Sequence, residues 1–285
     1  MRSASRPRLP FVLSTEPERK PTGYPAPKAP GGRLGVASVK LSPATADSGK
    51  PPLFLLYGLF LYRELARCLG SDQPTYGIYV GEELGTQHEH AEFPFSSVEE
   101  VAGRYIEEVR AIQPGGPYQL GGESFGGLVA FEVAQRLVRQ GEEIALLTLF
   151  DTGVPGHYKR SNAERLRNHL GAIRTIGPVH LSYMGKRLAS RVLGAWRNLG
   201  SGGRDFAESR SRIARRYQVG PFPGKIVVFK AFEDYRGARA DDLGWTDYAE
   251  ELVVYEVPGD HVGILKQPNV SILADKLTRH LYAQG

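Results

Sequence analysis

The pattern of apolar and polar positions changes at about residue 34. Before this point the chain has no apolar periodicity, whereas after it apolar runs of strand length alternate with amphipathic stretches of helix length. This alternation is typical of a mostly parallel β-sheet whose two faces are covered by helices. The sequence therefore predicts an α/β fold, with strands over residues 36–41, 53–56, 76–80, 118–120, 144–150, 226–229 and 252–257.

Two of the helices expected between these strands carry clear end signals. Ser97 and Glu100 form an S-x-x-E capping box, and apolar residues follow it at helical spacing. A second helix is predicted over residues 125–140 and is ended by Gly141, because glycine readily adopts the left-handed conformation that follows a helix C-terminus. These two helices precede and follow the strand at residues 118–120.

The alternation fails between Asp151 and Pro221, where a long segment of helical character is interrupted by glycines. We interpret about residues 155–220 as a helical lid inserted into the α/β domain. Residues 1–32 hold seven prolines and end in two glycines, a composition typical of a linker or tail. The predicted organisation is a tail over residues 1–33 followed by one domain over residues 34–285.

The composition is that of an ordinary soluble domain, with 41% apolar and 24% charged residues. No stretch approaches the roughly 18 consecutive apolar residues that a membrane helix requires. The apolar stretch after the N-terminal arginines is short and is broken by Pro10. A single cysteine, Cys68, cannot form an internal disulfide. We expect a cytoplasmic protein that is neither secreted nor bound to a membrane.

Basic residues are concentrated in the predicted lid. Residues 157–217 contain 14 lysines and arginines against 3 acidic residues, a net charge of +11. The whole chain has a net charge of +5, so the remaining residues sum to −6. This local basicity predicts a partner surface and argues against a uniformly basic nucleic-acid-binding protein; ordinary solvated helix faces are the alternative interpretation.

A glycine-rich segment at residues 121–126 lies between a predicted strand and a predicted helix and reads Gly-Gly-Glu-Ser-Phe-Gly. This is the G-x-S-x-G pattern in the strand–turn–helix context of a nucleophile elbow. The glycines let the strand and the helix approach closely, which holds Ser124 on a sharp turn at the carboxyl end of the sheet. The helix start directs N–H groups toward developing negative charge. Ser124 is therefore the predicted nucleophile.

A serine hydroxyl is a poor nucleophile at neutral pH and needs a general base nearby. His261 follows the strand at residues 252–257 in a Pro-Gly-Asp-His turn, at the sheet end expected to carry Ser124. His280 falls in the C-terminal helix and is interpreted as a surface residue. His261 is therefore the predicted base.

The base needs an acid that orients it, and two carboxylate sites are placed to serve. Asp151 directly follows the strand at residues 144–150, whereas Glu233 and Asp234 follow the strand at residues 226–229. A carboxylate at the end of a buried strand is costly unless it is paired. This argument favours Asp151 as the acid.

The polar segment around His88 and His90 is the other candidate for a functional site, because histidines are common metal ligands. Glu83 and Glu89 lie nearby, but no further residues follow at the spacing of metal ligands. The sequence therefore predicts no metal ion and no cofactor.

From about Gly35 to the C-terminus the chain resembles the type I thioesterase domains of polyketide and nonribosomal peptide synthetases. That family implies the α/β-hydrolase fold with a helical lid and supports Asp151 as the acid. The resembling motifs are at residues 51–56, Tyr62, Leu65-Ala66, residues 118–127, Asp151, Pro223-Gly224-Lys225, Leu243-Gly244-Trp245 and Gly259-Asp260-His261.

The resemblance implies that Ser124 takes an acyl chain from the phosphopantetheine thioester of an acyl or peptidyl carrier protein. Water, or a hydroxyl or amine of the chain itself, then releases the small-molecule product. Family members usually place His-Gly and a glycine-rich loop after the first buried strand, but here Tyr57-Gly58 passes straight to Leu59. The N–H groups of Phe125 and Leu59 are the expected oxyanion donors.

Two alternatives to a thioesterase stay open, and the shortened loop favours the first of them. Losing one oxyanion donor typically costs about 2.7–4 kcal/mol of transition-state stabilisation. One alternative is therefore a catalytically weak or inactive α/β-hydrolase-like module that binds a carrier protein through its basic lid. The other is a carboxylesterase or an acyltransferase that uses the same three residues on different acyl donors.

Overall fold

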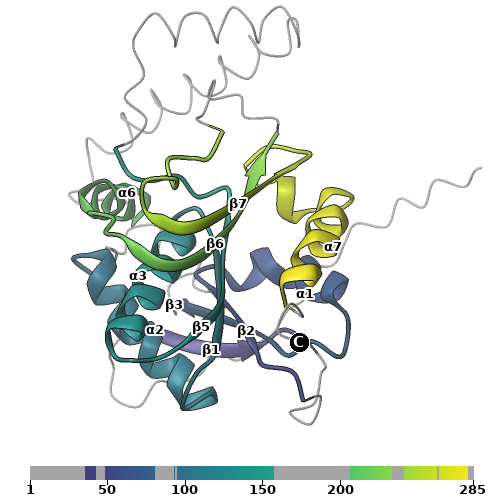
Figure 1. Cartoon of the computed structure of the whole chain (residues 1–285), viewed down its shortest axis with the longest axis horizontal. Helices are drawn as coiled ribbons and strands as arrows, with labels where there is room; N and C mark the ends of the chain where they lie inside the picture. Colours follow the sequence, from purple (N-terminus) through teal and green to yellow (C-terminus); the bar gives the residue numbers. More distant parts are fainter. Residues whose placement is uncertain are drawn as a thin grey trace, which may run out of the picture.

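A computed structural model gives the arrangement of the chain (Figure 1). It describes residues 36–42, 49–80, 93, 95–156, 206–232, 241–261 and 263–281. The predicted tail over residues 1–33 and most of the predicted lid lie outside this range, as do His88 and His90.

The described residues form a seven-stranded sheet in the order β1-β3-β2-β4-β5-β6-β7. β1 pairs with β3 in the antiparallel direction, and the remaining neighbours are parallel. The prediction of a mostly parallel sheet is confirmed. The strands are β1 (Val36–Lys40), β2 (Leu53–Leu56), β3 (Thr75–Val80), β4 (Tyr118–Glu123), β5 (Ile144–Phe150), β6 (Phe222–Ala231) and β7 (Ala249–Val257).

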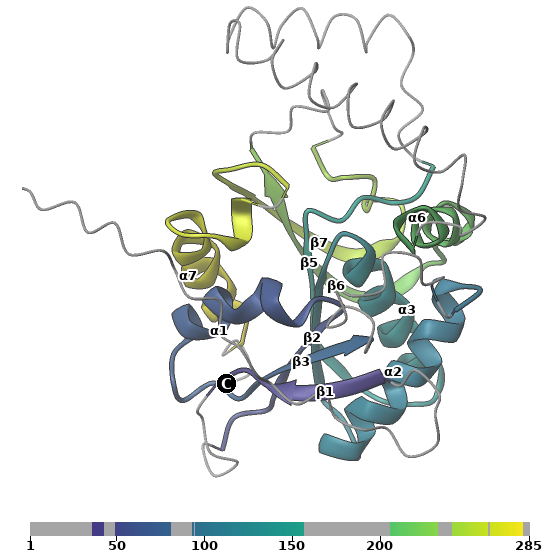
Figure 2. The same cartoon turned by 180° about the vertical axis from the view of Figure 1, so that it is seen from behind.

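Helices cover both faces of the sheet, as the reverse view also shows (Figures 1 and 2). One face carries α2 (Val98–Ile112), α3 (Phe125–Arg139) and α6 (Phe206–Arg216), and the other carries α1 (Arg63–Leu69) and α7 (Asn269–Leu281). Each layer encloses its own buried apolar cluster. Two short 3-10 helices, η2 (Leu59–Tyr62) and η4 (Gly263–Leu265), follow the ends of β2 and β7. None of the described helices has the length and apolarity needed to cross a membrane.

The helix start predicted at Ser97 is confirmed, with a variation in its cap. Ser97 is the N-cap of α2, and its hydroxyl accepts a hydrogen bond from Glu100 N at 3.1 Å. The Glu100 carboxylate accepts from Ser96 N at 2.8 Å, and this backbone bond lowers the pKa of Glu100. Both bonds satisfy N–H groups at a helix start that have no partner within the helix.

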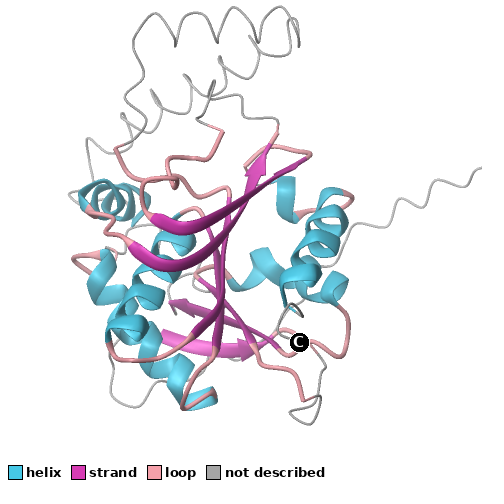
Figure 3. Ribbon diagram, in the orientation of Figure 1, coloured by secondary structure: helices cyan, strands magenta, loops and turns pink. Residues whose placement is uncertain are grey.

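Four of the strands, which Figure 3 shows in magenta, are longer than the sequence predicts. β3 begins at Thr75, one residue before its predicted start, and β7 begins at Ala249, three residues before its predicted start. β4 continues three residues beyond Leu120, because residues 121–123 pair with residues 148–150 of β5. β6 begins at Phe222, with a register irregularity between Phe222 and Lys225. Pairing with a neighbouring strand overrides the weak local strand propensity of glycine and proline at these positions.

Close backbone packing fixes where α3 starts. A Cβ at Gly126 would lie 2.3 Å from Leu56 O, and a Cβ at Gly122 would lie 2.2 Å from Gly126 O. Real Cβ atoms do not approach so closely, so only glycine allows the start of α3 to rest on the carboxyl ends of β2 and β4.

We expect Gly126→Ala to lower the free energy of unfolding by about 1–3 kcal/mol or more, because the added methyl group meets backbone and not a flexible side chain. Gly115→Ala is the matched control, since a Cβ there has no neighbour within 4 Å; its expected effect is within about 0.5 kcal/mol. Urea unfolding followed by circular dichroism measures both. Equal stabilities of the two variants would contradict the packing argument.

Candidate active site

Ser124 occupies a strained turn between β4 and α3. Its backbone angles are φ 54° and ψ −115°, a conformation that non-glycine residues rarely adopt. The turn is held because Ser124 N donates to Phe150 O at 3.1 Å and Ser124 O accepts from Leu128 N at 3.3 Å. This is the geometry that the G-x-S-x-G pattern predicts. It places the Ser124 hydroxyl at the N-terminus of α3.

Asp151 and His261 are in direct contact at the same end of the sheet. Asp151 Oδ2 lies 2.5 Å from His261 Nδ1, and Asp151 Oδ1 accepts from Ala231 N at 3.1 Å. Asp151 N donates to Phe229 O at 2.7 Å, so β6 holds both its backbone and its side chain. The Asp151 side chain has no exposed surface. A buried carboxylate with these fixed partners can orient an imidazole ring.

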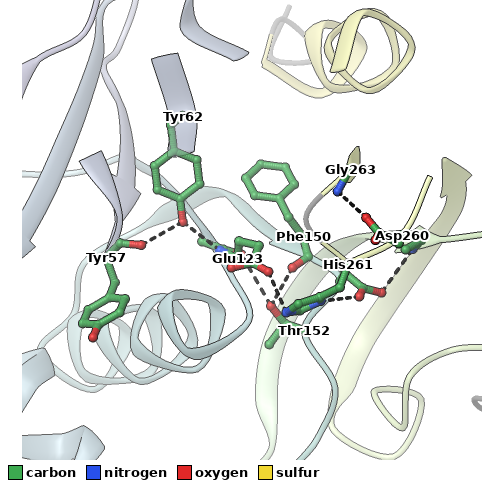
Figure 4. A network of polar contacts seen from close by, with 11 residues as sticks. Tyr57, Tyr62, Glu123, Phe150, Thr152, Asp260, His261 and Gly263 are labelled. Carbon is green, nitrogen blue, oxygen red and sulfur yellow. Dashed lines mark hydrogen bonds and ion pairs between the residues drawn. The ribbon is translucent and has the colours of Figure 1, made fainter. Parts of the chain in front are cut away.

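Glu123, the residue directly before Ser124, contacts the other nitrogen of the same ring. Its Oε1 lies 2.7 Å from His261 Nε2, and its side chain is 12% exposed (Figure 4). His261 thus has a carboxylate at each ring nitrogen, one from the end of β4 and one from the residue after β5.

The loop that carries His261 is closed by two polar contacts. Asp260 Oδ1 accepts from Gly263 N at 2.7 Å, and Asn269 Nδ2 donates to Gly263 O at 3.1 Å. Gly259 has a φ of 101°, and a Cβ there would meet Asn269 Nδ2 at 2.5 Å. The Pro-Gly-Asp-His turn is therefore anchored to the start of α7, which fixes the position of the His261 backbone.

Tyr62 links the carboxyl ends of β2 and β4. Its buried hydroxyl donates to Leu56 O at 2.9 Å, with Tyr57 O at 3.3 Å. The same hydroxyl accepts from Glu123 N at 2.8 Å (Figure 4). A phenol hydroxyl can donate one hydrogen bond and accept another, so a single side chain satisfies two backbone groups. This contact sets the spacing between the segment that follows β2 and the turn that holds Ser124.

Both expected oxyanion donors lie at helix starts beside this junction. Phe125 is the first residue of α3, and Leu59 is the first residue of η2, directly after Gly58. The first N–H groups of a helix have no intrahelical partner. A Cβ at Gly126 would lie 3.1 Å from the Tyr57 side chain, so the α3 start contacts the β2 end that leads into Leu59.

Thr152 packs where β5 leaves the sheet toward the predicted lid. A Cβ at Gly127 would lie 2.0 Å from Thr152 Oγ1, and Trp245 Nε1 donates to Thr152 O at 2.7 Å. The fully buried Trp245 therefore braces the segment that follows Asp151. This contact gives the Leu-Gly-Trp motif a physical role in the site.

The other residues that the sequence offered for an acid, a base or a metal site do not contact His261 in the part of the chain that the structure describes. Glu233 and Asp234, the alternative acid, lie outside the described residues, as do His88 and His90. Within the described ranges no group of three metal-ligating side chains is found. His280 Nε2 lies 3.1 Å from Tyr255 Oη, and its burial lowers its pKa.

Sequence reasoning missed the contact of Glu123 and the hydroxyl of Tyr62. Glu123 stands directly before Ser124 in G-x-S-x-G, but its partner lies far away in the chain. Tyr62 belongs to one of the resembling motifs, and that motif assigns it no role. Neither contact leaves a local signal in the sequence.

The order of the strands, the turn at Ser124 and the covered faces of the sheet define an α/β-hydrolase fold. The family model described as thioesterase domain matches residues 60–281. The chain therefore belongs to the thioesterase domain family, and the resemblance seen in the sequence is confirmed.

The relatives of the chain include large synthetases. Chondramide synthase cmdD of Chondromyces crocatus is 29% identical over 266 residues, which cover 81% of this chain and 7% of that protein. Vanchrobactin synthetase VabF of Vibrio anguillarum is 27% identical over 256 residues, which cover 85% of this chain and 8% of that protein. The chain thus corresponds to a small part of each relative.

Solved structures show the same fold. The NocB thioesterase domain in covalent complex with a fluorophosphonate nocardicin G analog matches with a TM-score of 0.58 at 23% identity, covering 87% of this chain and 99% of that one. The Vlm2 thioesterase domain matches with a TM-score of 0.55 at 23% identity, covering 87% and 99%. The predicted α/β-hydrolase fold is confirmed.

We expect Tyr62→Phe to cost about 1–3 kcal/mol of stability, because Glu123 N loses its acceptor in a partly buried position. Activity should fall as well, since the β2 end and the Ser124 turn lose their link. Tyr255→Phe, which removes a hydroxyl bonded to His280 of α7, is the control and should leave activity unchanged. Thermal unfolding and turnover of an acyl thioester measure the two effects; unchanged activity in Tyr62→Phe would contradict the link.

Proposed function

We propose that the chain is a serine thioesterase that releases an acyl or peptidyl chain from the phosphopantetheine thioester of a carrier protein. The observation that carries the proposal is the contact of buried Asp151 with His261 at the sheet end where Ser124 occupies its strained turn. Membership of the thioesterase domain family and the likeness to parts of synthetases support the substrate class.

The proposed reaction begins with His261 as general base. His261 Nε2 takes the proton of Ser124, and Ser124 Oγ attacks the thioester carbonyl, forming a tetrahedral intermediate. The phosphopantetheine sulfur leaves with the proton from the imidazolium, which gives an acyl-Ser124 ester. Water, or a hydroxyl or amine of the acyl chain, then attacks this ester, and release is hydrolytic or cyclising accordingly. Asp151 keeps the ring oriented and stabilises its positive charge.

The oxyanion of the intermediate is proposed to accept hydrogen bonds from Phe125 N–H and Leu59 N–H. Their positions at the starts of α3 and η2 support this assignment. The positive end of the α3 dipole adds to the stabilisation of the charge. Every step uses side chains and backbone of the chain and the arm of the carrier protein, so the proposed reaction includes no cofactor.

A basic helix on the side of the proposed site favours an acidic carrier protein as partner. Arg210 on α6 donates to Tyr57 Oη at 3.2 Å, which places α6 beside the end of β2. Tyr217 donates to Glu132 Oε2 at 2.9 Å, and burial together with this carboxylate raises the pKa of Tyr217. α6 is thus fixed to α3, and it ends in the exposed Arg215 and Arg216.

We expect Ser124→Ala to abolish the acyl adduct and to reduce turnover by about 10⁴-fold or more, because no other nucleophile replaces the hydroxyl. Intact mass spectrometry after incubation with an acylated carrier protein or an acyl-thioester mimic measures the adduct. Ser271→Ala on α7 is the matched control and should react as the native chain does.

The same experiment separates the alternatives. Adducts formed only with simple esters would favour a carboxylesterase, and transfer of the chain to an added acceptor would favour an acyltransferase. No adduct with any donor, while the carrier protein still binds, would contradict the enzyme and favour an inactive carrier-binding module.

We expect the double variant Arg215→Glu, Arg216→Glu to raise KM for a carrier-bound acyl chain by about tenfold at low salt. Turnover of a small thioester mimic should be unchanged. The matched control is Arg67→Glu with Arg279→Glu, which also reverses two basic residues in the last turns of helices but on the opposite layer. Equal effects of the two pairs, or no effect of salt, would contradict docking through α6.

A further inference from the structure

The carboxylate of Glu123 contacts the nitrogen of His261 that is proposed to act as general base. Glu123 ends β4, so its backbone is held by the sheet and by Tyr62, whose hydroxyl accepts from Glu123 N. Its Oε1 is 2.7 Å from His261 Nε2, the nitrogen that must take the proton of Ser124 (Figure 4).

A hydrogen bond between an imidazole nitrogen and a carboxylate oxygen requires a proton on one of the two atoms. Asp151 occupies the other nitrogen, Nδ1, and favours a proton there. An imidazolium between two carboxylates fits this geometry. In this state Nε2 has no free lone pair, and the site holds one proton more than the state that can deprotonate Ser124.

We propose that Glu123 is a positioning residue that holds His261 in a protonated resting arrangement, and that the site becomes competent when the shared proton leaves. This inference rests on the proposed function, since it assigns His261 Nε2 the role of general base. The proton passes to solvent, after which Nε2 has a lone pair for the hydroxyl of Ser124.

The charged groups around the ring favour the resting arrangement. Glu123 faces it from β4, Asp151 from the end of β5, and Asp260 lies in the loop of His261 itself. Opposite charges nearby stabilise the protonated form of an imidazole.

Two basic residues on the described elements packed around this edge, Lys230 and Arg210, have other partners. Lys230 of β6 lies 3.4 Å from both Asp241 and Glu256, the latter on β7. Arg210 of α6 donates to Tyr57 Oη. Tyr62 of η2 contributes a hydroxyl that is bonded to backbone atoms. Among the described residues, Glu123 and Asp151 thus contact His261, while Lys230 and Arg210 are engaged with other groups.

The proposal predicts a pH dependence with a definite sign. Below the pH at which the shared proton leaves, the base is blocked, and above it the base is available. Glu123→Gln keeps the shape of the side chain but removes its charge, and Glu123→Ala removes the contact. Both should release the second proton of His261 at lower pH, so the acidic limb of the rate profile should move down by about one pH unit or more.

The test uses a fluorophosphonate probe, which reports on Ser124 without knowledge of the acyl chain. Ser124 Oγ forms a bond to phosphorus, the P–F bond breaks and fluoride leaves, while the serine proton passes to His261. At a pH below the limb, the two Glu123 variants should react about tenfold faster than the native chain, and the rates should converge at high pH. Glu107→Gln on the exposed face of α2 is the matched control and should follow the native profile.

A second measurement tests the role of Glu123 independently of the proposed thioesterase activity. Titration of the His261 ring by ¹⁵N NMR, with His261→Gln to assign its signals, reports its protonation without any reaction. We expect the second proton to bind at higher pH in the native chain than in Glu123→Gln. An identical midpoint in the two chains would overturn the role of Glu123, even if the native chain reacted with the probe. A native chain that never reacts with the probe would count against Ser124 as nucleophile, and the titration would still decide the role of Glu123.

Discussion

The close packing of three backbone segments at Ser124 is the constraint on which the rest of the structure depends. The end of β4, the start of α3 and the end of β2 approach one another at distances that no Cβ would permit, as the positions of Gly122 and Gly126 show. This packing forces Ser124 into its positive φ, and the surrounding contacts offset the cost of that conformation, which is of order 1–3 kcal/mol. It also brings the starts of α3 and η2 together, so the strained serine and both proposed oxyanion donors arise from one packing arrangement.

The parallel sheet also fixes the positions of site residues that come from distant parts of the chain. Ser124 and Asp151 each follow a strand directly, and each donates its backbone N–H to the next strand in the sheet. They are therefore placed almost as firmly as residues inside the strands. His261 lies in a loop, but the polar contacts of that loop and the carboxylate of Asp151 hold the ring toward the same edge. Precision in the site thus comes mainly from backbone hydrogen bonds.

Glu123, the acidic residue beside Ser124, makes the surroundings of His261 negatively charged. With carboxylates at both ring nitrogens, His261 lies in a local surplus of negative charge, whereas the exposed end of α6 is basic. In the functions proposed above, the first charge distribution acts on the protons of His261, and the second acts on a carrier protein. The two are carried by different elements, so each can be altered without the other.

The sequence by itself determined the elements whose signals are local. The apolar runs at 53–56 and 144–150 match β2 and β5 because polar and proline residues bound them, and the turn at Ser124 follows from its glycines. The tertiary structure alone decided that β4 continues to Glu123, because that extension depends on pairing with β5. It alone decided that Glu123 meets His261, because β5, β6 and β7 lie between the two residues along the chain. Such contacts depend on which strands become neighbours in the sheet, and the local propensity of a segment does not determine its neighbours.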